Sequence, residues 1–259
     1  MFISLLTVSS IFAVAAAFPA SDGSSTVAPR AGNYIVQKEI SGTCWYPPGS
    51  TSNCPTKSQL ITGDVDNGER TGIILQNLDF SPRSFFVYKN SCECMPVKYI
   101  TIGAGLKRFV AFDPGFQGRI VRGTTNANLD GKSHALGTWM EFSWDLDDGT
   151  GWADVSLIKG CDGAVDVEAL DDLGAKTGFS DNVLDGAPQE AYKQKSSSKE
   201  LVIMETESLT NATVINTAAR DWLAGKLGYK KAYVDDHHGN PDICSTNGRF
   251  LIRFWPGRP

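Results

Sequence analysis

Residues 137–160 contain two runs in which apolar and polar positions alternate strictly, on either side of an acidic turn that contains glycine. Alternation with a period of two is typical of a strand with one buried face, so the segment predicts a β-hairpin. With Asp148 and Gly149 as a two-residue tip, Ser143 lies opposite Asp154. One face of the hairpin is then apolar and predicts a core, formed by Met140, Phe142, Trp144, Ala153, Val155 and Leu157.

The opposite face of this hairpin combines acids with tryptophans. It presents two carboxyls, Glu141 and Asp154, and two indoles, Trp139 and Trp152. In the predicted register the acids are diagonal neighbours, with side chains roughly 7–8 Å apart. Carboxyls about 6.5–9.5 Å apart are typical of inverting glycosidases, and exposed indoles can stack on sugar rings. The face therefore predicts a carbohydrate site, and a solvated polar sheet face is the alternative.

The rest of the chain predicts short strands separated by turns, with one helix near the end. The helix is capped by Asn216 or Thr217, ends at Gly228 and aligns apolar residues on one face. We expect strands at residues 34–40, 72–78, 84–88, 97–102, 108–112, 119–121, 164–169, 201–205, 232–234 and 249–255. Many short strands and one confident helix indicate a mainly β fold.

The beginning of the chain predicts a secreted protein. Residues 1–17 are uncharged and mostly apolar, end in three alanines and are typical of a signal peptide. Residues 18–30 are rich in proline, serine and glycine, and predict a flexible tail or a short propeptide. We expect residues 31–259 to form one domain, with a helix-containing insertion near residues 170–228. A sequon at Asn211 predicts N-glycosylation, which is consistent with extracellular localisation.

Six cysteines lie beyond the predicted signal peptide. An even number in an oxidising compartment predicts three disulfides. Cys92 and Cys94 form a C-x-C pair on an extended chain, where their Cβ atoms stand too far apart to bridge without strain, which leaves about 12 of the 15 possible pairings open. The cysteine spacings match no paired zinc motif, so we expect neither a metal nor another cofactor.

The chain is acidic, with a net charge of −5 and a pI near 5.2. Proteins that bind nucleic acids or anionic membranes depend on surfaces rich in lysine and arginine, so the charge argues against both partners. We expect a monomer whose partner is a polysaccharide or a host surface protein.

Several short motifs resemble those of thaumatin-like proteins. Residues 138–143 and 154–160 are similar to that family's TxxEFS and YDVSxVDG motifs, and residues 118–121 resemble its GRIW strand. The final segments are similar to its AYxxDD, TC and YxVxFCP ending: residues 232–236, 243–244 and 249–256. The chain departs from the family in having six cysteines rather than ten or sixteen. Lys159 also replaces an acid of the family's cleft.

The resemblance implies a thaumatin-like β-sandwich with a small helical and loop lobe, and an acidic cleft that binds or hydrolyses β-1,3-glucan. Glu141 and Asp154 match two cleft acids, Asp162 is a candidate replacement for the missing one, and Arg122 lies one position from the cleft arginine. The expected ligand-binding residues are Arg122, Trp139, Glu141, Trp152, Asp154 and Asp162. The resemblance also implies a Cys161–Cys244 disulfide, with Cys44 and Cys54 bridged to Cys92 and Cys94.

Three functions from different classes follow from these features. The first is a secreted protein that binds a cell-wall glucan or a host surface through its acidic groove, in defence, antagonism or virulence. The second is an endo-β-1,3-glucanase that uses Glu141 as the acid and Asp154 as the base. The third is a structural or regulatory secreted protein without sugar chemistry. The resemblance supports the fold better than a complete catalytic set, so the binding protein ranks first.

Overall fold

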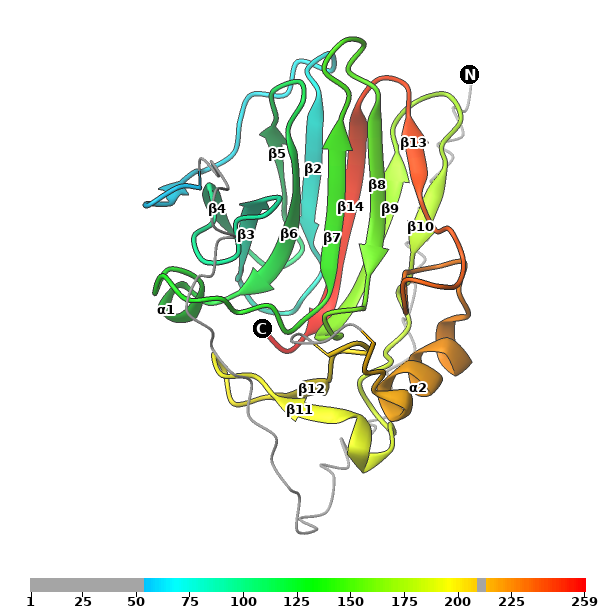
Figure 1. Cartoon of the computed structure of the whole chain (residues 1–259). Helices are drawn as coiled ribbons and strands as arrows, with labels where there is room; N and C mark the ends of the chain where they lie inside the picture. Colours follow the sequence, from blue (N-terminus) through cyan, green and yellow to red (C-terminus); the bar gives the residue numbers. More distant parts are fainter. Residues whose placement is uncertain (1–53, 209–212) are drawn as a thin grey trace, which may run out of the picture. The chain divides into compact units, whose positions relative to one another are not determined.

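Two β-sheets packed face to face form the main body of the described chain (Figure 1). The computed structural model describes residues 54–208 and 213–259. The predicted signal peptide, the tail at residues 18–30, the strand at 34–40, Cys44 and Asn211 lie outside the described residues. The mainly β fold class expected from the sequence is confirmed.

The larger sheet has seven strands in the order β1-β4-β3-β6-β7-β8-β13. Its members are β1 (Gln59–Leu60), β3 (Arg83–Lys89), β4 (Lys98–Ile102), β6 (Gln117–Gly123), β7 (Trp139–Trp144), β8 (Gly151–Ser156) and β13 (Ile243–Ser245). The smaller sheet has the order β10-β9-β14-β2-β5. Its members are β2 (Gly72–Asn77), β5 (Lys107–Ala111), β9 (Gly163–Ala169), β10 (Lys176–Gly178) and β14 (Arg249–Gly257).

The core fills the space between the two sheets and draws on the inward positions of both. Phe85 of the larger sheet contacts Phe254 of the smaller one, with ring centroids 4.8 Å apart. Trp144 stacks on Phe112 at 4.8 Å, and its indole nitrogen donates a hydrogen bond to the Gly248 carbonyl. The six apolar hairpin residues predicted to face a core are all buried in this cluster. The hairpin is thus anchored to the core by one face, and its other face lies on the outer side of the sheet, where it can contribute to a binding site.

The small lobe contains helices and short strands and lies beneath one end of the sandwich (Figure 1). It includes the one-turn helix η1 (Gln189–Ala191), the pair β11 (Tyr192–Gln194) and β12 (Leu201–Ile203), and α2 (Thr217–Leu227). A short helix, α1 (Thr125–Asn128), follows β6. Helix α2 coincides with the predicted helix and buries its predicted apolar face, formed by Ala219, Leu223 and Leu227. In the described part of the chain, no helix is long and apolar enough to cross a membrane.

The predicted strand at residues 232–234 is absent as a strand, although Tyr233 forms an isolated parallel bridge with Ser156 of β8. Strands β1, β10, β11 and β13 were not predicted. Each has two or three residues. A segment this short cannot show a convincing alternating pattern, so pairing with its neighbours defines it.

The hairpin register differs from the predicted one by two residues. Glu141 pairs directly with Asp154, and Ser143 pairs with Trp152. Asp145 is the reason, because its Oδ1 accepts hydrogen bonds from the backbone of Asp147 and Asp148 and so forms a longer turn. A shift of two residues keeps every side chain on its predicted face. The acids therefore share a face as expected, but as direct neighbours rather than diagonal ones.

The predicted Cys161–Cys244 disulfide is wrong, because both thiols are free. Cys161 lies beyond the end of β8, where its backbone pairs with Ile203 of the lobe. Cys244 pairs with Trp152 near the other end of β8. Since the strand separates the two sulfurs, no bridge can form. Burial also raises the pKa of the Cys161 thiol to about 11.

The remaining cysteine predictions concern the loop between β3 and β4. A disulfide joins Cys54 to Cys92, with Cα atoms 5.5 Å apart, which agrees with one of the expected pairings. Cys94 is also disulfide-bonded, and the predicted role of Cys44 lies outside the described residues. The Cys54–Cys92 bridge ties the loop that carries Glu93 to the segment before β1, and Glu93 accepts a hydrogen bond from Arg119 on the outer face of the larger sheet.

Candidate functional site

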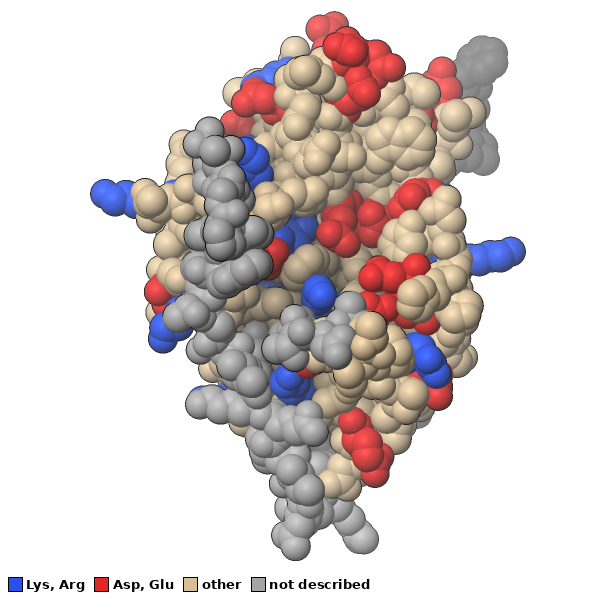
Figure 2. All heavy atoms as spheres, viewed as in Figure 1, with Lys and Arg blue, Asp and Glu red and all other residues tan. Residues whose placement is uncertain are grey.

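A row of polar side chains crosses the outer face of the larger sheet. Direct cross-strand pairing places four residues in this row: Tyr88 on β3, Arg119 on β6, Glu141 on β7 and Asp154 on β8. Directly paired residues in a sheet point to the same side. Asp242 comes next, immediately before β13, which is the neighbour of β8. Figure 2 shows acidic side chains gathered on the face that this view presents.

A groove of about 370 Å³ lies over the acidic end of this row. Its floor and walls come from the loop after β3 and from β6, β7, β8 and the segment before β13. The lining residues are Asn90, Gln117, Gly118, Glu141, Phe142, Ser143, Trp152, Ala153, Asp154 and Asp242. Three of these carry carboxyl groups, and none of the described lining residues is a lysine or an arginine. Trp152 is half exposed at 50%, so one part of its indole is open to solvent.

Asp154 lies in a setting that favours its protonated form. Burial, together with the nearby carboxylates of Glu141 and Asp242, raises the pKa of this carboxyl to about 8. Its Oδ1 is buried and has no hydrogen-bond partner among the described residues. At neutral pH Asp154 is therefore a neutral acid, able to donate one hydrogen bond into the groove and to accept another.

Glu141 is the ionised member of the pair. Burial raises the pKa of Glu141 above its usual value, while the Arg119 guanidinium and a hydrogen bond with Ser156 act in the opposite direction. Lys159, which replaces an acid of the resembling family, also lowers the pKa of Glu141. Two adjacent carboxyls cannot both ionise cheaply, so the pair holds one proton, and that proton resides on Asp154.

Arg119 is held in place by aromatic rings and an acid. Its guanidinium lies 3.9 Å from the ring centroid of Trp139 and 4.8 Å from that of Tyr88. Its Nη2 donates to Glu93 Oε2 at 2.7 Å, and its side chain is buried. The arginine therefore acts as a fixed positive charge beside Glu141 rather than as a mobile ligand-binding arm.

Trp139 does not line the groove, in contrast to the sequence-based expectation. Its indole nitrogen donates to the Ala135 carbonyl at 2.8 Å, and its ring supports Arg119. It faces a separate, very small cavity of about 10 Å³. Of the two predicted stacking platforms, the structure brings only Trp152 beside the acids.

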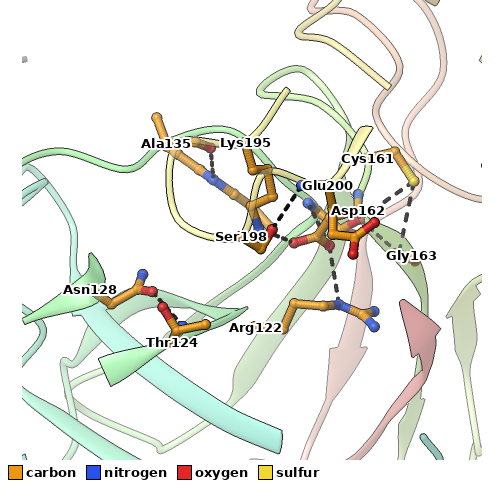
Figure 3. A network of polar contacts seen from close by, with 12 residues as sticks. Arg122, Thr124, Asn128, Ala135, Cys161, Asp162, Gly163, Lys195, Ser198 and Glu200 are labelled. Carbon is orange, nitrogen blue, oxygen red and sulfur yellow. Dashed lines mark hydrogen bonds and ion pairs between the residues drawn. The ribbon is translucent and has the colours of Figure 1, made fainter. Parts of the chain in front are cut away.

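Arg122 and Asp162, both predicted to bind ligand, are buried instead in a polar network at the end of the sandwich (Figure 3). Arg122 Nε lies 3.1 Å from Asp162 Oδ1, and Lys195 Nζ lies 2.8 Å from Asp162 Oδ2. Arg122 also donates to the carbonyls of Trp255 and Ala164. The alternating pattern explains the difference, since Arg122 lies three residues after Arg119 and points to the opposite side of β6.

Sequence reasoning did not identify Arg119, Asp242 or Tyr233 as residues of this site. The Tyr233 hydroxyl donates to Asn240 Oδ1 at 2.8 Å and to Asp242 Oδ1 at 3.1 Å, which holds Asp242 at the groove edge. Burial and the neighbouring acids raise the pKa of Tyr233 to about 12. Arg119 carried no clear signal, because residues 117–123 do not alternate between polar and apolar, and its pairing with Glu141 places it on the outer face. Asp242 carried no sequence signal, since only the pairing of β13 with β8 brings it to the groove.

Comparison with known proteins does not identify a family for this chain. No family model and no curated protein matches the sequence. One similar solved structure is that of the protein elicitor MoHrip2 from Magnaporthe oryzae, with 13% identity and a TM-score of 0.29. The match covers 51% of this chain and 89% of that one. A score this low does not establish a shared fold, so the thaumatin-like assignment remains a resemblance of short motifs.

Proposed function

We propose that this chain is a secreted, monomeric protein that binds a cell-wall glucan in the groove over β7 and β8, with a role in defence, antagonism or virulence. The observation that carries the proposal is the half-exposed Trp152 beside the Glu141–Asp154 pair in one groove. Aromatic faces bind the apolar faces of sugar rings, while carboxyls bind their hydroxyls. A host surface protein is the alternative partner for the same groove.

The hydrogen-bonding groups of the groove suit a polyol. A sugar hydroxyl both donates and accepts, so a good site offers both kinds of partner. Glu141 supplies acceptors, protonated Asp154 supplies a donor, and Asn90 and Gln117 at the rim supply amides of both kinds. A glucan could therefore bind without a metal or another cofactor.

The glucanase is the second candidate, and one observation favours it. Two paired carboxyls, one protonated and one ionised, are the minimum set for glycoside hydrolysis. Directly opposite residues have Cβ atoms about 4.5–5.5 Å apart, which is nearer the spacing of retaining than of inverting glycosidases. On this reading Asp154 is the acid and Glu141 the nucleophile, which reverses the roles expected from the sequence.

The test of the binding proposal is calorimetric titration of the mature protein with a β-1,3-glucan oligosaccharide. Glu141→Gln should weaken binding about tenfold, or about 1.4 kcal/mol, because it removes a charged acceptor. Glu69→Gln, a charge-matched change at an exposed site away from the groove, should leave binding unchanged. Equal affinity in both variants would contradict the proposal.

Release of reducing ends separates binding from turnover. Because a binding protein leaves the glucan intact, we expect little or no release by the native protein. A robust rate that is lost in both Glu141→Gln and Asp154→Asn would establish the enzyme instead. Absence of both binding and release would leave the structural or regulatory class.

A further inference from the structure

The groove carries more negative charge than a neutral glucan requires. Glu141 and Asp154 line its floor, Asp242 lines its edge, and the described lining has no basic residue. Asp242 is exposed and has no ion pair among the described side chains, although it accepts the Tyr233 hydroxyl. Three converging carboxyls beside an open indole form a site suited to a ligand with positive charge.

The basic groups nearest the groove do not satisfy these acids. Arg119 and Lys159 act on Glu141, and Arg119 is already engaged with Glu93. The charges that act on Asp154 are the carboxylates of Glu141 and Asp242. The buried Asp154 Oδ1 also lacks a hydrogen-bond partner among the described residues. An unpaired buried oxygen carries a cost in free energy.

We propose that the groove prefers glycans with protonated amino groups, such as oligosaccharides of β-linked glucosamine, and binds one ammonium between Asp154 and Asp242 with a sugar ring on Trp152. The inference rests on the groove being a glycan site, as proposed above, and it names the class of sugar. An ammonium supplies three donors and a charge, so it can hydrogen-bond to the Asp154 and Asp242 carboxyls that line the groove, and it relieves the repulsion among the acids.

The ammonium replaces the proton that Asp154 otherwise holds. On binding, that carboxyl ionises, its proton passes to solvent, and the new positive charge is the bound ammonium. A neutral sugar cannot drive this exchange, because it brings no charge to offset the ionised acid. The preference therefore depends on the amine itself and not on the length or linkage of the glycan.

The experiment is calorimetric titration at pH 6 with three hexasaccharides: β-1,4-glucosamine, β-1,4-N-acetylglucosamine and β-1,3-glucose. The first two share linkage and length, whereas acetylation removes the positive charge and converts each amine into an amide. We expect the glucosamine hexamer to bind at least tenfold more tightly than its acetylated form. Equal or weaker binding of the glucosamine hexamer would overturn the inference.

Two variants localise the effect. Asp242→Asn should reduce affinity for the glucosamine hexamer about tenfold and leave the glucose hexamer unaffected, because asparagine removes the charge at this exposed position and keeps an oxygen for the Tyr233 hydroxyl. Asp147→Asn, the same change at the exposed hairpin tip, should alter neither affinity. An equal loss in both variants would show general attraction to an acidic protein and would overturn the inference.

Titration with hexalysine tests whether the site recognises an amino sugar specifically or binds any cation. Trp152→Ala should weaken the glucosamine hexamer about tenfold and leave any binding of hexalysine unchanged, because only the sugar stacks on the indole. Hexalysine binding as tight as that of the glucosamine hexamer would overturn the inference in favour of a basic peptide. Binding of the glucose hexamer without an amine preference would leave the proposed function standing, whereas binding of no hexasaccharide would contradict both.

Discussion

Asp154 and Glu141 are chemically similar acids on neighbouring strands, yet their surroundings give them different protonation states. Asp154 has two acids near it and an oxygen without a partner. Glu141 has Arg119 directly opposite on β6 and a hydrogen bond with Ser156. The difference arises because the Arg119 guanidinium lies beside Glu141, whereas the charges near Asp154 are carboxylates. Asp154 therefore donates a hydrogen bond and Glu141 accepts one.

Asp154→Asn should alter how stability depends on pH. Because the pKa of Asp154 is raised to about 8 in the folded protein, the folded state holds an extra proton between about pH 4 and pH 8. The free energy of unfolding contributed by this group is therefore highest in acid and falls as pH rises, by at most about 1.4 kcal/mol per pH unit. Asparagine mimics the neutral acid, so the variant should not lose this stability as pH rises.

The measurement is urea denaturation of both proteins at pH 4, 6 and 9. The variant should match the native protein at pH 4 and exceed it by a few kcal/mol at pH 9, as an order of magnitude. Asp147→Asn serves as the control, since that exposed acid should give no such trend. A constant difference across the range would show that Asp154 is ionised in the folded state.

At the scale of elements, β6 joins the site to the rest of the larger sheet. Its alternating positions present Arg119 to the outer face and Ile120 to the core. Gly118 allows the close approach of β3, because a Cβ there would lie 2.1 Å from the Tyr88 carbonyl oxygen. Tyr88 in turn supports Arg119, so the spacing of these strands determines where the positive charge lies relative to Glu141.

Gly118→Ala should destabilise the protein by about 1–3 kcal/mol, because the clash is with backbone and the strands must separate. Gly225→Ala provides the matched control. It lies in α2 with nothing within 4 Å of the added Cβ, and the change should stabilise by about 0.4–1 kcal/mol. Denaturation curves of both variants give the comparison. An unchanged free energy of unfolding in Gly118→Ala would mean that β3 and β6 can move apart without cost.

At the scale of the whole molecule, one buried ionic network joins the small lobe to the sandwich (Figure 3). Asp162 follows β8 and lies between Arg122 of β6 and Lys195, which follows β11. Arg122 also holds the carbonyl of Trp255 on the last strand. Segments 133 residues apart in sequence thus meet at the Arg122 guanidinium. Asp162 is fully buried between this guanidinium and Lys195, which explains why it is unavailable to a ligand.

Asp162→Asn should destabilise the protein by about 3–5 kcal/mol, because it leaves two buried cations without their counter-charge. Asp181→Asn is the matched control, since it removes a solvent-exposed pair with Lys231 and should cost about 0–1 kcal/mol. Thermal unfolding followed by circular dichroism measures both. Equal losses of stability in the two variants would show that the network is dispensable. Loss of glucan binding in a folded Asp162→Asn protein would show that this residue takes part in ligand binding after all.

The sequence alone determined the faces of the hairpin and the position of α2. Both follow from local periodicity, because the side-chain direction along a strand or helix repeats every two or about 3.6 residues whatever surrounds it. For the same reason it placed Glu141, Asp154 and Trp152 on one face. Local pattern also predicted a mainly β fold. The Cys54–Cys92 bridge agrees with a set of pairings that the resemblance implied, with its order left open.

Only the tertiary structure decided the register, the neighbours and the charge states. The Asp145 turn shifted Glu141 to a position directly opposite Asp154. The ends of β8 separated Cys161 from Cys244, whose bridge had been inferred from a resemblance. The hairpin register depends on side-chain hydrogen bonds within the turn, and the cysteine positions depend on contacts between residues distant in the chain. Periodicity carries no information about either. The proton on Asp154 also depends on tertiary structure, because burial and the acids supplied by β7 and by the segment before β13 create its surroundings.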